Sequence, residues 1–458
     1  MRIMILVALL LCLPLLGLAQ QGQRKLFPYE YTIDDLPNGL RLVTVPTDYP
    51  NLIALYIVVE AGSRNEVEAG KSGFAHFFEH MMFRGSQNYT PEQREEIFKR
   101  AGAETNAYTS DDRTVYHATF DKADLEEIFK VEADRFARLK YTPAQYKTEA
   151  LAVLGEYNKN SANPFFKMAE VMRETSFKKH TYSHTTMGYL KDIQDMPNQY
   201  DYSLEFYSRF YRPEYATIVV VGDVTHARAL ELTKKYWSDW KRGSYKADIP
   251  AEPEQGGART AHIDWPSPTL PHLAVAFRGP AYSDERKDKP ALDLLSQIAF
   301  GDNSELYQRL VLKEQKVDLL GPDFGNQADP ELFAVFARVK DQKDVDYVRD
   351  QILKTFERYK TDLIDQAKLD ATRSRQRYGV AMALDSSDAI AGALAPYISL
   401  RRTPETLNKL FNLYDQVTPQ DMRDMARKYF REENRTIVTL ATKAGTPTAS
   451  NARQGGGN

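Results

Sequence analysis

The chain nearly lacks cysteine. Its 458 residues include a single one, Cys12, which lies in an apolar stretch at the N-terminus. Once that stretch is removed, the mature chain can form no disulfide, and it has no thiolate to act as a nucleophile or a metal ligand. Any metal site must therefore be built from His, Asp and Glu, and stability must come from hydrophobic cores.

The chain also lacks an excess of either charge and any long hydrophobic run beyond its N-terminus. Its 60 Lys and Arg residues nearly balance 63 Asp and Glu residues, giving a formal net charge of -3. This balance gives no indication of binding to nucleic acid or to an anionic membrane surface. No later stretch reaches the ~20 apolar residues that a membrane span needs.

The first residues have the pattern of a secretory signal. A basic start at Arg2 precedes an apolar run over residues 3–18, and small residues lead to a cleavage site near Ala19. A transmembrane anchor is the alternative, but the run is short and is interrupted by Pro14. We therefore expect residues 1–19 to be removed and the mature protein to be exported, to the periplasm or the outside.

Two parts of the chain repeat. Residues 210–221 align without gaps on residues 429–440, and residues 50–57 resemble residues 271–278. A repeat of this length indicates a duplicated domain rather than a solenoid unit. The expected divisions are an N-terminal peptidase domain over residues 28–242, a linker rich in Pro, Gly and charge over 243–268, a C-terminal domain over 269–444, and a disordered tail over 445–458.

Hydrophobic periodicity predicts both strands and helices. Strands grouped with helices, without strict alternation, favour the α+β class. Several helices are expected to begin with a Thr-Pro capping box. The expected strands are Leu52–Glu60, Thr114–Phe120 and Thr217–Val224, and the expected helices are Ser72–Phe83, Pro91–Ala101, Lys122–Leu139 and Pro143–Lys159.

The segment "GFAHFFEHMMFRG" (residues 73–85) places three costly polar groups in an apolar run. On a helix, His76, Glu79 and His80 share one face. Two imidazoles four residues apart can hold one zinc ion, and the glutamate then lies beside the open position of the metal, where a general base belongs. This is the inverted His-x-x-Glu-His order of some zinc peptidases, although five residues alone are a weak signature.

A catalytic zinc needs a third protein ligand from elsewhere in the chain. The helix expected from Pro143 offers Glu149 and Glu156, which lie almost two turns apart on one partly apolar face. Two helices that each direct carboxylates inward could meet at a metal. The alternative is that both glutamates belong to a solvated face beside Lys147 and Lys159.

Longer blocks resemble the inverted-motif zinc metallopeptidases, which include pitrilysin, insulin-degrading enzyme and the mitochondrial processing peptidase. The blocks are residues 61–86, residues 102–120 and residues 210–224, and the resemblance covers roughly residues 30–442. It implies two homologous α/β-roll domains, each a mixed and mainly antiparallel sheet with helices packed on it. Joined by the linker, they would form half of a clam shell, as in the short-chain, processing-peptidase-like branch.

The resemblance also implies roles for individual residues in a metalloendopeptidase that cleaves unfolded or short peptides. One zinc ion per chain would be bound by His76, His80 and Glu156, with Glu79 as general base and Glu149 as a supporting carboxylate. An extended substrate would add to a sheet edge by β-augmentation. The residues expected at that edge are Asn106, Ala107, Tyr108 and Thr109.

The C-terminal half departs from the pattern of an active half. Active single-chain and homodimeric relatives carry there an Arg and a Tyr, seven residues apart, that stabilise the oxyanion. Here Lys313–Gln315 match the surrounding segment, but the two positions hold Val311 and Asp318. This implies a heterodimer in which a sister chain supplies the pair, with a homodimer less expected. Alternatively, Arg309 or Tyr307 takes the role.

No zinc is expected in the C-terminal half, because other residue types stand opposite the motif. Two further hypotheses stay open for the whole protein: a non-catalytic assembly subunit, and a peptide-binding subunit that keeps a zinc site. The paired histidines His180 and His184 are interpreted as loop or helix-edge residues. The three residues opposite the motif are Asp293, Ser296 and Gln297.

Overall fold

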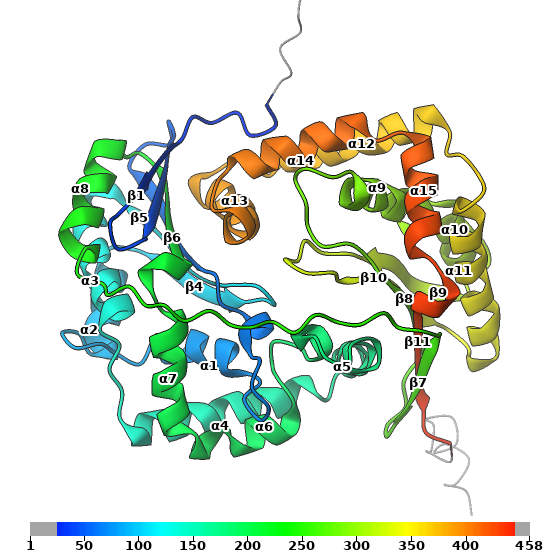
Figure 1. The fold of residues 1–458 in the computed structure, drawn as a ribbon, viewed down its shortest axis with the longest axis horizontal. Helices are drawn as coiled ribbons and strands as arrows, with labels where there is room; N and C mark the ends of the chain where they lie inside the picture. The colour runs from blue at the N-terminus through cyan, green and yellow to red at the C-terminus, as the bar shows by residue number, and fades with distance from the viewer. Residues whose placement is uncertain (1–24, 445–458) are drawn as a thin grey trace, which may run out of the picture.

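A computed structural model describes residues 25–444, so the expected signal (residues 1–19) and tail (445–458) lie outside the described residues. Two sheets stand side by side, each with helices packed on it (Figure 1). Among the described helices, none is long and apolar enough to cross a membrane.

The five strands of the second sheet repeat the order of five strands of the first, which has β1 as an additional edge strand. In the first sheet the order is β1-β2-β6-β3-β5-β4, and in the second it is β7-β11-β8-β10-β9. In each, the pair β2/β6 or β7/β11 is parallel and the other neighbours are antiparallel. The strands are β1 (Thr32–Asp35), β2 (Arg41–Pro46), β3 (Leu52–Val59), β4 (Glu104–Thr109), β5 (Thr114–Asp121), β6 (Ala216–Gly222), β7 (Arg259–Trp265), β8 (His272–Arg278), β9 (Val317–Asp323), β10 (Leu332–Val339) and β11 (Arg435–Thr442).

This shared topology confirms the α+β class with two duplicated, mainly antiparallel sheets. The aligned segments of the repeat fall on β3 and β8 and on β6 and β11, which are central strands of the two sheets. The helices are α1 (Phe74–Met81), α2 (Pro91–Arg100), α3 (Leu125–Ala137), α4 (Pro143–Asn160), α5 (Pro164–Ser176), α6 (Leu190–Asp195), α7 (Tyr200–Phe210), α8 (His226–Trp237), α9 (Asp288–Phe300), α10 (Glu305–Tyr307), α11 (Val345–Tyr359), α12 (Gln366–Met382), α13 (Ser387–Arg401), α14 (Glu405–Gln416) and α15 (Pro419–Tyr429).

The expected elements are present with ends shifted by a few residues, and the capping boxes are confirmed. The hydroxyls of Thr90 and Thr142 accept hydrogen bonds from the backbone N–H groups of Gln93 and Gln145. The two glutamine side chains accept in return from the threonine N–H groups. With proline at the first helical position, these boxes fix where α2 and α4 begin.

The two halves exchange a helix. Helix α5 of the first half packs on β7, β8 and β11 of the second sheet, and α13 of the second half packs on β3 and β6 of the first. The α5 contact includes the buried residues Met168 and Met172 against Ala276 and Leu440. Each sheet is therefore covered on one face by a helix from the other half (Figure 1), and neither half can bury its core alone.

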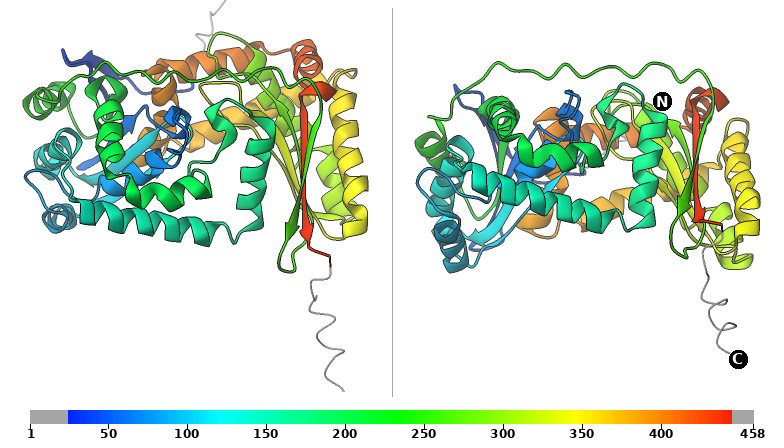
Figure 2. Two further views of the ribbon diagram at one scale, coloured as in Figure 1. Left: turned by 60° about the horizontal axis from the view of Figure 1, so that its bottom comes forward. Right: turned by 90° about the horizontal axis from the view of Figure 1, so that it is seen from below.

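The expected linker is shorter than residues 243–268. An extended connection without helix or strand runs over residues 241–258, along the outside of both halves (Figure 2). Strand β7 follows it, although sequence composition placed this strand in the linker. The strand is explained by its alternating burial, in which Trp265 is buried while Ala261 and Ile263 pack against the core under α5.

The helix exchange predicts that a substitution in α13 destabilises the first half. Leu394 is fully buried in the core that joins α13 to the first sheet. Leu394→Ala should lower the free energy of unfolding by about 2–5 kcal/mol. In a Trp265→Phe background, urea unfolding followed by the fluorescence of Trp237 and Trp240 reports on the first half alone.

The matched control is Leu363→Ala, since that leucine is 50% exposed. It should change the free energy of unfolding by no more than about 0.5 kcal/mol. If Leu394→Ala left the first-half midpoint unchanged, α13 would not stabilise the first sheet.

Candidate metal centre

Helix α1 buries an apolar face and turns a polar stripe toward α4. The aromatic residues Phe74, Phe77 and Phe78 are fully buried in the core between α1 and the first sheet. The stripe consists of His76, which is buried, and of Glu79 and His80, which are half-buried. The predicted helical spacing of the three polar residues is therefore confirmed.

The start of α1 is fixed by a remote carboxylate. Glu66, fully buried, accepts hydrogen bonds of 2.7 Å from the backbone N–H groups of both Gly73 and Ala75. Gly73 has φ 90°, and a Cβ there would lie 2.3 Å from a side-chain atom of Ile193, so only glycine fits. Burial raises the pKa of Glu66, while the two N–H groups oppose this rise.

The side chains of His76, His80 and Glu156 converge. Glu156 Oε2 lies 3.7 Å from His76 Nε2 and 3.4 Å from His80 Nε2. One ligand atom from each residue lies within 4.8 Å of the other two, and this is the one such group found among the described residues. In a tetrahedral zinc site with bonds of 2.0–2.1 Å, ligand atoms stand about 3.3–3.4 Å apart. The donor set and spacing therefore fit zinc.

A second carboxylate orients this cluster. Glu149, on α4 and buried, lies 2.9 Å from His80 Nδ1, so the Nε2 atom of that ring is directed to the cluster. Its other oxygen accepts from the Arg84 guanidinium. Burial would raise the pKa of Glu149, but the bonds from His80 and Arg84 hold it below its usual value. The hydrogen bond to Glu149 in turn raises the pKa of His80.

The pKa values of the two imidazoles are shifted in opposite directions, upward for His80 and downward for His76. Burial, with a smaller contribution from the nearby His80, lowers the pKa of His76 to about 4. His76 is thus neutral at pH 7, as a metal ligand must be. Its Nδ1 atom is buried and has no hydrogen-bond partner in the part of the chain that the structure describes.

Glu79 is held at the side of the cluster by the first sheet. The hydroxyl of Thr109, at the end of β4, donates a hydrogen bond of 2.6 Å to Glu79 Oε2. Burial raises the pKa of Glu79, and the Thr109 bond acts in the opposite direction. A carboxylate with a raised pKa beside an open ligand position suits a group that takes up and releases a proton.

The expected substrate strand is an edge strand. Asn106, Ala107, Tyr108 and Thr109 all lie in β4, which pairs with β5 on one side and ends the first sheet on the other. Asn106 is exposed, and Tyr108 packs against the core under α13. Thr109 points to the opposite face, toward α1. The edge is open to pairing in the described chain.

The second half has an ion pair where the first half has the motif. Asp293 on α9 forms an ion pair with Lys289 one turn earlier and accepts a 2.6 Å hydrogen bond from Tyr414. The hydroxyl of Ser296 donates to the backbone of the same helix. Neither these residues nor Gln297 belongs to a group of metal-ligating side chains among the described residues.

The segment expected to stabilise an oxyanion has other contacts. Val311 packs against the core in a short π-helical stretch, Gln308–Lys313. Asp318 forms a bidentate ion pair with Arg338, with distances of 2.8 and 3.1 Å. Arg309 donates to the Gln351 side chain at 2.7 Å.

His180 and His184 stand at the two ends of a 3-10 turn, Thr181–Ser183, which agrees with their interpretation as loop or helix-edge residues. Both are buried, and His180 Nε2 lies 3.0 Å from Asp329 of the second half.

Sequence reasoning missed Glu66 and Arg84 as supports of the cluster. Both stand in the family-like block of residues 61–86, which was the one indication available.

Comparisons with known proteins agree with this geometry. Residues 42–190 match the family Insulinase (Peptidase family M16), and residues 199–376 match Peptidase M16 inactive domain. The zinc protease PqqE of Helicobacter pylori is 30% identical over 93% of this chain and 95% of that protein.

Two solved structures are similar. A protease from Helicobacter pylori has 29% identity and a TM-score of 0.84, covering 90% of this chain and 99% of that chain. The periplasmic protease PqqL from Escherichia coli has 19% identity and a TM-score of 0.72, covering 93% of this chain but 50% of that chain. At this identity the second likeness shows the fold.

The duplicated fold and the His-His-Glu cluster beside a fourth polar residue define the class of inverted-motif metallopeptidases. Within that class, the chain belongs to the insulinase family of peptidases, M16. The C-terminal match to an inactive domain agrees with the ion pair that replaces the motif on α9.

The cap on α1 predicts a large stability loss on removal of Glu66. Glu66→Ala leaves two buried N–H groups without partners, at about 1–3 kcal/mol each, so the free energy of unfolding should fall by about 2–6 kcal/mol. Glu68→Ala is the matched control, because that side chain is 40% exposed and pairs with Arg209 at the surface. Its loss should stay below about 1 kcal/mol in the same urea titration. Equal losses would contradict the capping role.

Proposed function

We propose that this chain is a zinc metalloendopeptidase that cleaves unfolded or short peptides. The observation that carries the proposal is the convergence of His76 Nε2, His80 Nε2 and Glu156 Oε2 beside Glu79. The donor set is that of a catalytic zinc site with one open position. The relative that is 30% identical is named a zinc protease, which supports the same metal here.

When bound, zinc supplies Lewis acidity that polarises a peptide carbonyl and acidifies a water molecule. The chain's own residues do the remaining work. Glu79 takes a proton from the attacking water and passes it to the leaving amine. Thr109 holds Glu79 in place through its hydrogen bond, and Glu149 fixes the ring orientation of His80. The adjoining edge of β4 aligns the substrate as an added strand.

We further propose that a sister chain completes the active site. Val311 and Asp318 offer no side chain for an oxyanion, since one is apolar and the other is paired with Arg338. Arg309 is engaged by Gln351, which weakens the alternative that Arg309 takes this role; Tyr307 remains the other local candidate. This chain matches half of the Escherichia coli protease, which leaves in that protein a second half of similar length, and we propose that a sister chain takes the corresponding place here. A heterodimer is favoured over a homodimer.

The proposed location is the periplasm, or the outside of the cell. The expected signal at residues 1–19 supports export, and the structurally similar Escherichia coli protease is named periplasmic. The competing candidate is a subunit that binds zinc and peptides without hydrolysis. The intact set of ligands with Glu79 argues for catalysis, because binding alone needs no general base.

Hydrolysis of a quenched, unstructured peptide by the purified mature chain tests the proposal. Glu79→Gln should lower turnover by about 10²–10⁴-fold, because it removes the proton acceptor. The zinc content, measured by atomic absorption, should stay at one per chain in both proteins.

Each outcome of this assay has a consequence. Turnover by the chain alone that depends on Glu79 would support catalysis and contradict the need for a partner. If the chain binds zinc but is inactive, adding a family member that carries the Arg–Tyr pair should restore turnover. Zinc binding without turnover under either condition would favour the non-catalytic subunit.

The role of Glu149 predicts a weaker metal site in Glu149→Gln. The amide can no longer accept as a charged partner of both His80 and Arg84, so zinc affinity should fall about 10–100-fold. Competition with a chromophoric chelator measures this affinity. Glu170→Gln is the control, since Glu170 on α5 bonds Tyr157 and lies outside the cluster. Equal affinities in the two variants would show that Glu149 does not support the metal.

A further inference from the structure

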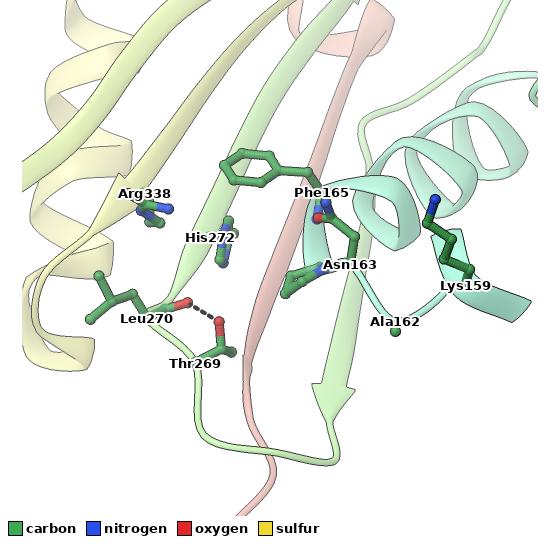
Figure 3. A pocket seen from close by; sticks show the side chains of 9 residues that line it. Lys159, Ala162, Asn163, Phe165, Thr269, Leu270, His272 and Arg338 are labelled. Atoms are coloured by element: carbon green, nitrogen blue, oxygen red, sulfur yellow. Dashed lines mark hydrogen bonds between the residues drawn. The ribbon is translucent and has the colours of Figure 1, made fainter.

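A cavity of about 530 Å³ lies at the corner between α4 and α5, where the first half meets the second sheet (Figure 3). Lys159 stands on one side of it, at the end of α4, and Arg338 on the opposite side, on β10. Between them are Phe165 at the start of α5, the loop residue Leu270 and His272 at the start of β8. The cavity is separate from the metal cluster but shares α4 with it.

The cavity lies within reach of a peptide held at the cluster. Lys159 follows Glu156 by three residues on α4, which places it about 4.5 Å further along the helix axis and about 60° around it. An extended peptide covers about 3.3–3.6 Å per residue. A substrate held at the cluster therefore needs only a few residues to reach the cavity.

The cavity favours negative charge. Lys159 is exposed, and no carboxylate within residues 25–444 forms an ion pair with it. Helix α5 begins here with Asn163 as its N-cap, so its positive end faces the cavity. Arg338 adds little free charge, because Asp318 holds it in a bidentate pair.

A buried imidazole supplies an independent sign of a ligand. His272 is 3% exposed and lines the cavity, yet its Nδ1 atom has no hydrogen bond of regular geometry within the described chain. Burial lowers the pKa of His272, although the carbonyl of Leu270 favours the protonated ring. Nδ1 is enclosed beside that carbonyl, so Nε2 is the nitrogen left for a bound molecule, and it donates a hydrogen bond when a bound carboxylate keeps the ring protonated. Its edge-on contact with Phe165, at 4.6 Å between ring centres, holds the imidazole in place.

We propose that this cavity binds a carboxylate of the peptide substrate, within a few residues of the cleaved bond. The carboxylate is either the C-terminal group or the side chain of Asp or Glu. Lys159 and the start of α5 attract it, the His272 ring donates a hydrogen bond to it from Nε2, and the apolar walls at Phe165 and Leu270 hold the attached carbon atoms. The inference rests on the proposed peptidase function and names its substrate class.

The test uses three peptides of one sequence: one with a free C-terminus, one amidated, and one amidated with Asp as its last residue. Lys159→Gln should raise KM for the first peptide, and for the third if a side-chain carboxylate is accepted, by about three- to tenfold. KM for the plain amide and kcat for all three should stay unchanged.

Two further variants sharpen the test. Lys147→Gln removes the same charge from an exposed site on α4 and should change no KM value. His272→Phe keeps the ring beside Phe165 but removes both nitrogens, and it should act in the same direction as Lys159→Gln. His272 is buried, so its replacement can also disturb folding, and the result with the exposed Lys159 therefore decides the test.

Binding of the same peptides to Glu79→Gln, followed by fluorescence anisotropy, needs no turnover. If this variant prefers carboxylate peptides and loses the preference with Lys159→Gln, the cavity assignment holds even where the wild-type chain is inactive and the proposed function fails. Suppose that the wild-type chain cleaves all three peptides and that Lys159→Gln and Lys147→Gln have the same KM values for them. The inference is then overturned while the peptidase function stands.

Discussion

Two imidazoles and a carboxylate can lie against the core of the first half only because α4 brings carboxylates to meet them. Polar groups buried without partners cost free energy, and α1 carries three in two turns. Glu149 engages the outer nitrogen of His80, and Glu156 faces the inner nitrogens of both rings. The positions of α1 and α4 are therefore coupled, and α1 is further held at its start by Glu66.

The exchange of helices extends this constraint to the whole chain. Helix α4 carries Glu156, and the next helix, α5, belongs by its packing to the second sheet. The reciprocal helix α13 covers the sheet whose edge strand, β4, supplies Thr109 to Glu79. A relative movement of the halves would thus strain the group of His76, His80 and Glu156 from both sides. The corner between α4 and α5 is therefore where the proposed substrate site would be coupled to the geometry of His76, His80 and Glu156.

Local patterns in the sequence were sufficient for His76, His80 and the capped starts of α2 and α4, because helical spacing is set by near neighbours. Glu156 could be assigned only through the resemblance to the family, since its contact with α1 joins segments that are distant in the sequence. The bonds from Thr109 to Glu79 and from Gly73 to Glu66 could not be predicted, because they depend on how a sheet edge and a loop fold back. Strand β7 was not predicted, because the Pro- and Gly-rich composition of the preceding connection led us to include its residues in the linker.

The second half satisfies the buried polar groups of an apolar helix in a different way. Helix α9 occupies the position of α1 and also carries polar groups in an apolar helix. There Lys289 and Asp293, one turn apart, neutralise each other, and the Tyr414 hydroxyl satisfies a remaining oxygen. Lys289 is buried against Phe324. An internal ion pair needs no third charge, so the polar groups of α9 satisfy one another, whereas the two imidazoles on α1 offer only nitrogen atoms and Glu156 completes the proposed metal site.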